Sequence, residues 1–184
     1  MQFQKNDTCI IFGSSPFKNI IGQNKINLLI GKYTTFGINN FPRSYNNVTY
    51  WIWSDYGAYR DSFPYINKQK IITSLEVYRK EINGEITPEY IFEGVSDIQN
   101  ELNNKLCIFK TTAHPAINYA YLLGFKNIIL VGIDLTSDWN HFYPSKKFIR
   151  TNKRIERIRN KLYEFKKYVN LYTLNKDSDL EIKR

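Results

Sequence analysis

The sequence predicts an α/β fold with a mostly parallel central sheet flanked by helices. One observation predicts the fold class and a second predicts the number of domains. Short apolar runs of strand length, such as Thr8–Phe12 and Ile128–Ile133, alternate along the chain with stretches of helical periodicity. Hydrophobic residues make up 42% of the 184 residues, which is enough for the core of one domain of ordinary size. Residues 1–184 are therefore expected to form a single domain.

The N-terminal part, up to Thr73, is predicted to contain four strands and one helix. The run Thr8–Phe12 is a strand, and Gly13-Ser14-Ser15 turns the chain into a helix over Phe17–Ile30, which Gly22 weakens. A serine before Pro16 suits this helix start, because serine caps free N–H groups and proline is tolerated at the first helical position. The further strands are predicted at Tyr33–Ile38, Val48–Trp53 and Lys70–Thr73.

Residues 74–104 are predicted to form an excursion from this pattern. The segment contains Glu, Asn, Gly and Pro residues and has one candidate strand, Tyr90–Phe92. We expect either a loop or a small β element here. The strand pattern then resumes at Leu106–Phe109.

The C-terminal part returns to an alternation of helices and strands. Pro115–Leu123 is predicted to be a short helix that ends at Gly124, because glycine commonly follows a helix. An apolar strand then ends at Gly132-Ile133-Asp134. Apolar residues at spacings of three, four and seven predict a long helix near Phe148–Tyr168, with a core-facing stripe and a basic outer face. A last strand is predicted at Asn170–Leu174.

The net charge of +9 is concentrated in one stretch. Residues 146–167 hold ten Lys or Arg residues and only two acidic ones, Glu156 and Glu164. Three interpretations stay open: a solvated helix face, a surface that attracts phosphate-rich ligands such as nucleotides, or contact with an anionic membrane or nucleic acid. No nucleic-acid-binding motif accompanies the basic stretch.

Other features favour a cytoplasmic protein, with peripheral contact to a membrane as an option. No segment approaches the ~20 apolar residues that a membrane-spanning helix needs. The N-terminus runs directly into a strand, without the features of a secretory signal. Cys9 and Cys107 each lie in an apolar run and are predicted to be buried thiols. We predict no cofactor and no metal site.

Polar residues follow the predicted strands in the same way at five places. They are Gly13-Ser14-Ser15, Asn39-Asn40, Ser54-Asp55, Lys110-Thr111-Thr112 and Gly132-Ile133-Asp134. In a parallel sheet the carboxyl ends of all strands lie along one edge, where ligands bind. Hydroxyls and helix N-termini suit phosphate, and amides and carboxylates suit base and ribose groups. The pattern predicts a nucleotide or sugar-nucleotide site; the alternative is that these residues only form caps and turns.

Two histidines and two strand-end residues complete the candidate set. Gly132 is interpreted as leaving room for a ligand against the backbone, and Asp134 as placing a carboxylate at the edge of the crevice. His141 is the candidate general base, because imidazole titrates near neutrality. His114 is interpreted as a binding or structural residue whose pKa is lowered by the positive end of a helix dipole.

In this order the motifs resemble those of bacterial lipooligosaccharide sialyltransferases, and the related pterin-diphosphokinase-like group shares the scaffold. The resemblance rests on short motifs over most of the chain: Gly13-Ser14-Ser15-Pro16, Phe36-Gly37-Ile38-Asn39-Asn40-Phe41, Thr111-Thr112-Ala113, Gly132-Ile133-Asp134, His141-Phe142 and the tail 162–174. The chain differs from the family in having Ser14 and Ser15 in its opening motif and His114 after Thr112-Ala113. About six residues separate Asp134 from His141, where the family has a longer lid.

The resemblance implies a Rossmann-like sheet and a metal-independent transfer reaction. It implies that Ser14, Asn39, Asn40 and Asp55, completed by Thr112, Gly132 and Asp134, line a cytidine-nucleotide site, and that His141 activates an acceptor hydroxyl. Strand-end hydroxyls and basic residues such as Lys110, Lys146 or Lys147 are expected to hold the phosphate.

The predicted function is transfer of a sugar from a nucleotide-sugar donor, with CMP-sialic acid as one candidate, to a glycan acceptor. Two alternatives stay open. One is a nucleotide-binding protein that kept the scaffold and lost the chemistry, as the short segment between Asp134 and His141 favours. The other is a Mg²⁺-dependent diphosphate-transfer enzyme, for which Asp55 and Asp134 are the candidate ligands.

Overall fold

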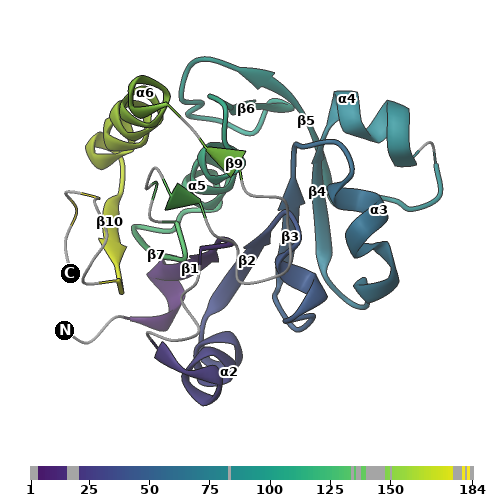
Figure 1. Ribbon diagram of the computed structural model, residues 1–184, viewed down its shortest axis with the longest axis horizontal. Coiled ribbons are helices and arrows are strands. Elements are labelled where there is room, and N and C mark those ends of the chain that lie inside the picture. The colour runs from purple at the N-terminus through teal and green to yellow at the C-terminus, as the bar shows by residue number, and fades with distance from the viewer. Residues whose placement is uncertain are drawn as a thin grey trace.

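The core of the protein is an eight-stranded sheet in which every neighbouring pair is parallel (Figure 1). The computed structural model describes residues 4–15, 21–82, 84–133, 135, 138–139, 148–149, 151–175, 180 and 182. The strand order is β10-β7-β1-β2-β3-β4-β5-β6. The strands are β1 (Thr8–Phe12), β2 (Thr34–Ile38), β3 (Tyr50–Trp53), β4 (Lys70–Ser74), β5 (Tyr90–Val95), β6 (Lys105–Cys107), β7 (Asn127–Val131) and β10 (Asn170–Thr173).

This order confirms the predicted α/β fold and is consistent with a Rossmann-like organisation. From β1 the chain adds strands outward to β6, and it then returns to the other side of β1 with β7 and β10. The described α-helices are α2 (Gln23–Lys32), α3 (Ala58–Ser62), α4 (Leu75–Val77), α5 (Ala113–Leu122) and α6 (Asn152–Glu164). A separate antiparallel pair is formed by β8 (Asp138–Trp139) and β9 (Phe148–Ile149).

Alternating strand residues bury two different faces of the sheet. On one face, Cys9 and Ile11 of β1 pack in the same cluster as Ala116 of α5 and Leu162 of α6. On the other face, Ile10 and Phe12 pack with α2, and the two tryptophans of β3 pack with α3 and the segment after α4. The alternation arises because successive side chains of a strand point to opposite sides.

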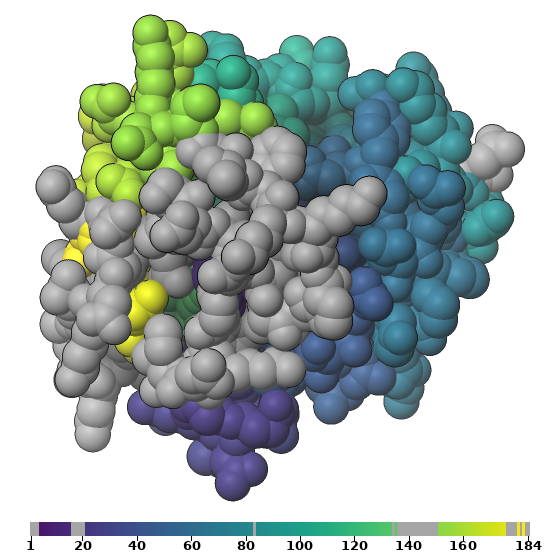
Figure 2. Space-filling model, viewed as in Figure 1, coloured from purple at the N-terminus to yellow at the C-terminus, as the bar shows by residue number. Residues whose placement is uncertain are grey.

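Helix α5 is almost completely buried, because it packs against the centre of the sheet. From Ala113 to Ala120 every residue of this helix is buried, and three of them are alanines, which let the helix backbone lie close to the sheet. The helix ends as predicted at Gly124, which adopts a φ of +90° that only glycine reaches without strain. Helix α6 differs, because only Ile155, Ile158 and Leu162 of its residues are buried. Figure 2 shows α6 at the upper left of the molecule, at the surface.

The structure differs from the predicted elements in two places. Residues 74–104 were expected to form a loop or a small β element with one candidate strand, Tyr90–Phe92; that strand is confirmed within β5, but it belongs to the main sheet, between β4 and β6. The predicted helix start at Phe148 was wrong, because Phe148–Ile149 forms β9. Helix α6 begins after Thr151, whose hydroxyl accepts a hydrogen bond from the backbone N–H of Arg154.

The remaining elements are short helical turns. The 3₁₀ turns are η1 (Lys5–Asp7), η2 (Phe41–Arg43), η3 (Phe63–Tyr65) and η5 (Phe165–Lys167), and η4 (Tyr78–Ile82) is a turn of π-helix that continues α4. Cys9 and Cys107 are buried and free, as predicted. Within the part of the chain that the structure describes, none of the helices has the length and apolar character to cross a bilayer.

Candidate functional site

The carboxyl ends of β1 and β7 close directly on each other. The backbone N–H of Gly13 donates to the carbonyl of Val131 at 2.7 Å, and that of Ser15 donates to the carbonyl of Gly132 at 2.9 Å. A Cβ at Gly13 would lie 2.4 Å from the Gly132 carbonyl oxygen, so only glycine fits there. Gly132 itself adopts a φ of +68°. Gly13 therefore permits the close approach of the two strand ends, and Gly132 adopts the left-handed backbone conformation found there.

This closure changes the roles expected for the opening motif. The N–H of Ser15 is already hydrogen-bonded and is not available to a phosphate, and Ser15 is buried. Ser14 lies half-buried at the same strand end. Gly132 was interpreted as leaving room for a ligand, but its carbonyl oxygen accepts from the Ser15 N–H and lies against the Cα of Gly13, where an added Cβ would clash with it.

Four of the polar strand-end residues meet in one hydrogen-bonded cluster, which we call the strand-end cluster: Asn39, Ser54, Asp55 and Thr112. Asn39 follows β2, Ser54 and Asp55 follow β3, and Thr112 precedes α5. The Thr112 hydroxyl lies 2.9 Å from the Ser54 hydroxyl, 2.9 Å from Oδ1 of Asn39 and 3.3 Å from Oδ2 of Asp55. The side chains are separated by up to 73 positions in the sequence.

The direction of these hydrogen bonds follows from the donors available. The amide Nδ2 of Asn39 donates to Oδ2 of Asp55 at 2.8 Å, so Oδ1 of Asn39 is its acceptor atom. Thr112 has one hydroxyl proton and gives it to Asn39 or Asp55, so the Ser54 hydroxyl donates to Thr112. Oδ1 of Asp55 takes no part in these bonds, and Asp55 is exposed. The cluster thus leaves one carboxylate oxygen of an exposed side chain outside its own hydrogen bonds.

Backbone conformation supports the position of the cluster. Asn39 has a φ of +49°, a left-handed conformation that asparagine tolerates better than most residues. Its N–H donates to the carbonyl of Ile52, and its own carbonyl accepts from the buried indole N–H of Trp51 at 2.7 Å. The Trp51 ring stacks on Trp53 with centroids 4.0 Å apart. The backbone of Asn39 is therefore fixed from two sides.

Asn40 does not join the cluster. Its Nδ2 donates to Asp61 at 3.4 Å and its Oδ1 accepts from the buried Ser62 hydroxyl at 3.1 Å. These contacts tie the end of β2 to helix α3. Asn40 therefore has a structural role in this arrangement, whereas the neighbouring Asn39 faces Asp55.

The start of α5 is arranged for side-chain contacts. Thr112 occupies the N-cap position but makes no capping bond, because its hydroxyl is used in the strand-end cluster. The backbone N–H of Ala113 instead donates to the Thr111 hydroxyl oxygen at 3.4 Å, and Pro115 has no N–H. Lys110 is exposed just before this start and adopts a φ of +59°. It brings a cation to the same edge of the sheet.

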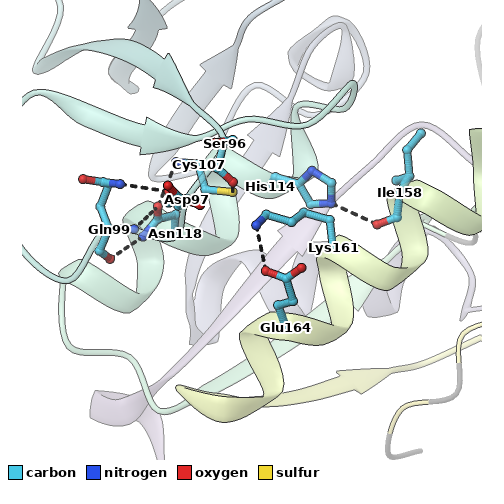
Figure 3. A network of polar contacts seen from close by, with 9 residues as sticks. All are labelled: Ser96, Asp97, Gln99, Cys107, His114, Asn118, Ile158, Lys161 and Glu164. Carbon is cyan, nitrogen blue, oxygen red and sulfur yellow. Dashed lines mark hydrogen bonds and ion pairs between the residues drawn. The ribbon is translucent and has the colours of Figure 1, made fainter.

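His114 is a buried structural residue. Burial lowers its pKa to about 4, and Nε2 lies 3.2 Å from the Ile158 carbonyl of α6. The pKa is lowered as expected from the sequence, but burial is the main cause and the helix dipole is not. Figure 3 shows His114 between α5 and α6. The imidazole joins the two helices and does not face the strand-end cluster.

The same helix anchors the segment before β6 through Asn118. Its Oδ1 accepts from the backbone N–H groups of Cys107 at 2.8 Å and Gln99 at 3.1 Å, and its Nδ2 donates to the Gln99 carbonyl at 2.9 Å (Figure 3). Cys107 donates its thiol to the Ser96 carbonyl, and burial raises its pKa to about 11. The thiol is held in its protonated form and is not a nucleophile at neutral pH.

A cavity of about 500 Å³ opens beside the strand-end cluster, over the carboxyl ends of β3 to β6. Ser54 lines it and at the same time bonds Thr112. Arg79 of η4 and Glu93 of β5 also line it. Neither residue is predicted from the sequence, because no local signal indicates the π-helical turn or the place of β5 at this edge. The volume lies within the range of about 300–1,000 Å³ that small-molecule sites occupy.

Other candidates are not placed by the structure. Asp134, His141, Lys146 and Lys147 lie outside the described residues. Among the side chains that are described, no group of three or more His, Cys, Asp and Glu residues is arranged to hold a metal ion. The hydrogen-bond neighbours of Asp55 are Asn39 and Thr112. Their amide and hydroxyl groups suit contact with the polar groups of an organic molecule.

The sequence matches no model of a known protein family and no curated protein sequence.

Proposed function

We propose that the strand-end cluster is part of a nucleotide-sugar site and that the protein transfers the sugar to an acceptor hydroxyl. The observation that carries the proposal is the convergence of Asn39, Asp55 and Thr112 at the carboxyl edge of a parallel sheet. Ligands of open α/β folds bind at this edge. Rigidly held amide and carboxylate groups are the partners that ribose hydroxyls and base edges need.

Each member of the cluster has a distinct task in this proposal. The unused Oδ1 of Asp55 accepts from a ribose hydroxyl, and the second N–H of Asn39 donates to the base or ribose. Thr112 fixes both by holding them in one hydrogen-bonded unit. Lys110, exposed beside the α5 start, supplies the positive charge for the phosphate.

The transfer step is a direct displacement. His141 takes the proton of the acceptor hydroxyl, the hydroxyl oxygen forms the new bond to the anomeric carbon, and the bond to the nucleotide phosphate breaks. The leaving nucleotide departs with the bonding electrons, and its charge is balanced by Lys110. Asp134 is proposed to order the donor side. These two roles rest on the sequence, in which Asp134 and His141 follow β7.

Calorimetric titration with CMP, UMP, GMP, AMP and TMP, with Mg²⁺ and with EDTA, tests the binding step. We expect one nucleotide to bind in both conditions, with CMP as the first candidate, and Asp55→Asn to weaken it about ten-fold. The matched control is Asp61→Asn, because Asp61 of α3 is also exposed but contacts Asn40 and not the strand-end cluster. Equal affinities for the wild type and Asp55→Asn would contradict the proposed site.

Transfer is tested with the sugar conjugate of the nucleotide that binds. Release of free nucleotide in the presence of an acceptor should be lost in His141→Ala while binding persists. Unchanged turnover in His141→Ala would exclude it as the base. Binding without any turnover in the wild type would favour the non-catalytic alternative, and a strict need for Mg²⁺ would favour diphosphate transfer.

A further inference from the structure

Two of the charged residues that line the cavity beside the strand-end cluster, Glu76 and Lys80, are paired with each other. Glu76 and Lys80 form an ion pair with 3.2 Å between Nζ and Oε1, and both bond the hydroxyl of Tyr56. Lys80 also lies 4.8 Å from the centre of the Tyr56 ring. The hydrogen bonds to Tyr56 and Lys80 lower the pKa of Glu76, so this group stays ionised and paired. The charges of Glu76 and Lys80 therefore compensate each other, and this part of the lining has no net charge to attract a ligand.

Two other charged residues of the lining are not paired in this way. Arg79 and Glu93 both line the cavity and are both exposed. Among the described residues, neither side chain has an ion pair or hydrogen bond with a protein group. They also do not pair with each other. The cavity therefore offers one free guanidinium and one free carboxylate.

The rest of the lining is partly apolar and tightly built. Phe92 is buried beneath the cavity, and Gly94 of β5 lies against Ile108, the residue that directly follows β6. A Cβ at Gly94 would lie 2.3 Å from Cγ2 of Ile108, so glycine is required for this close approach. Arg79 lies in the π-helical turn η4. Such turns are rare in proteins overall, and those that occur are often found at functional sites. The close approach of Gly94 and Ile108 thus helps to set the shape of the cavity.

These observations together describe a site for a small polar molecule with an acidic group. A guanidinium binds carboxylate or phosphate through two parallel hydrogen bonds. A free carboxylate only accepts, so it selects hydroxyl or amine donors. An apolar floor beneath polar walls suits the C–H face of a sugar ring.

We propose that this cavity binds an anionic sugar, with Arg79 on its carboxylate or phosphate and Glu93 on its ring hydroxyls. Ser54 lines the cavity and donates to Thr112, so an occupant lies next to the proposed nucleotide site. In the reaction proposed above, and resting on it, this occupant is the acceptor. The anionic group then sets acceptor specificity at a distance from the reacting hydroxyl.

The test is a titration of the ¹⁵N-labelled protein followed by NMR, with three probes of one sugar. Methyl glucuronide carries a carboxylate, glucose 6-phosphate carries a phosphate, and methyl glucoside carries neither. The anionic probes should shift the amide signals of Gly94 and Ile108 and should bind about ten-fold more tightly than methyl glucoside. Comparison of the two anionic probes identifies which acidic group the cavity prefers.

The variants separate the two charged groups. Arg79→Gln should remove the preference for the anionic probes, and Glu93→Gln should weaken all three probes by the same factor. Arg60→Gln is the matched control, because Arg60 is an exposed arginine on α3 that does not line the cavity. An unchanged ¹⁵N spectrum in the absence of sugar verifies that each variant is folded.

Equal binding of charged and neutral probes, or an anionic preference that survives in Arg79→Gln, would overturn the proposal. A parallel titration with CMP keeps the two proposals apart. Sugar binding in the cavity without nucleotide binding would keep the anionic-sugar site and overturn its role as acceptor. Nucleotide binding at Asn39 and Thr112 without sugar binding would overturn the cavity proposal alone.

Discussion

Two parts of the same sheet edge have been built in opposite ways. At the β1–β7 junction the strand ends touch, and Gly13 leaves no space even for a methyl group beside the Gly132 carbonyl. At the ends of β3 to β6 the strands and η4 leave a cavity of about 500 Å³ with charged walls. The strand-end cluster lies between them. A Rossmann-like order predicts which edge binds ligands, but the packing at each strand end decides where along that edge there is room.

The largest expected effect comes from breaking the closed side. Gly13→Ala puts a Cβ 2.4 Å from a backbone oxygen that cannot rotate away, so strand β1 or β7 must shift. We expect a loss of about 3 kcal/mol or more in the free energy of unfolding, measured by denaturant titration.

Gly31→Ala is the matched control for this substitution. Gly31 lies in α2 with open space around it, so alanine should stabilise the helix by up to about 1 kcal/mol. Equal effects of the two substitutions would mean that the β1–β7 contact is not tight.

A second effect concerns the buried helix beneath the edge. The pKa of His114 is about 4 in the folded protein and near 6.5 in the unfolded chain, so the unfolded state binds more protons between these values. Unfolding free energy should therefore fall as the pH drops from 6.5 to 4, by up to about 3 kcal/mol, and then level off. In His114→Phe this part of the pH dependence should vanish. A pH profile identical to that of the wild type would contradict the buried, neutral imidazole.

The third effect lies at the boundary between the two parts. Thr112→Val keeps the shape of the side chain and removes the hydroxyl that joins Ser54 to Asn39. We expect a loss of about 1 kcal/mol in stability and about ten-fold weaker nucleotide binding. Thr111→Val is the control, because its hydroxyl reaches only the Ala113 N–H at 3.4 Å. Equal nucleotide affinity in both variants would mean that the strand-end cluster is not part of the nucleotide site.

The smallest effect is expected on the open side. Lys80→Gln removes one member of an exposed, solvent-screened ion pair on the cavity wall. The midpoint of thermal unfolding should match that of the wild type at both low and high salt. A clear fall in the midpoint would show that this wall supports the fold, as the β1–β7 junction does.

The strands were predictable where burial makes the sequence locally apolar. β1 and β7 are buried along nearly their whole length, and both were identified from short apolar runs. β5 was recognised only at Tyr90–Phe92, because it continues through exposed Glu93 and Gly94. Its place in the sheet depends on pairing with β4 and β6, which no local pattern encodes.

The start of α6 shows how two local signals compete. Phe148 continues the apolar stripe of the helix, and that periodicity favoured an early start. Thr151 is the actual N-cap, and its hydroxyl accepts from Arg154 at 3.4 Å. Cap chemistry was the better guide to the boundary here, and periodicity the better guide to the buried face.

The candidate site was predictable in part, because parallel strands bring their carboxyl ends together. That rule brought Asn39, Asp55 and Thr112 into one cluster. It could not distinguish Asn39 from Asn40, since the two neighbouring amides bond different partners, Asp55 for Asn39 and helix α3 for Asn40. Arg79 was missed because its position depends on a π-helical turn, which the sequence does not reveal.

The indole of Trp51 gives this molecule a built-in optical probe. Its N–H donates to the carbonyl of Asn39, and its ring is stacked on Trp53. The energy of indole emission depends on the dipoles around the ring, so any ligand that moves Asn39 alters the fluorescence of this pair. The chain has three tryptophans, and replacing Trp139 by phenylalanine leaves the stacked pair as the sole indole emitters. Occupancy of the carboxyl edge can then be followed in a cuvette without attaching a dye.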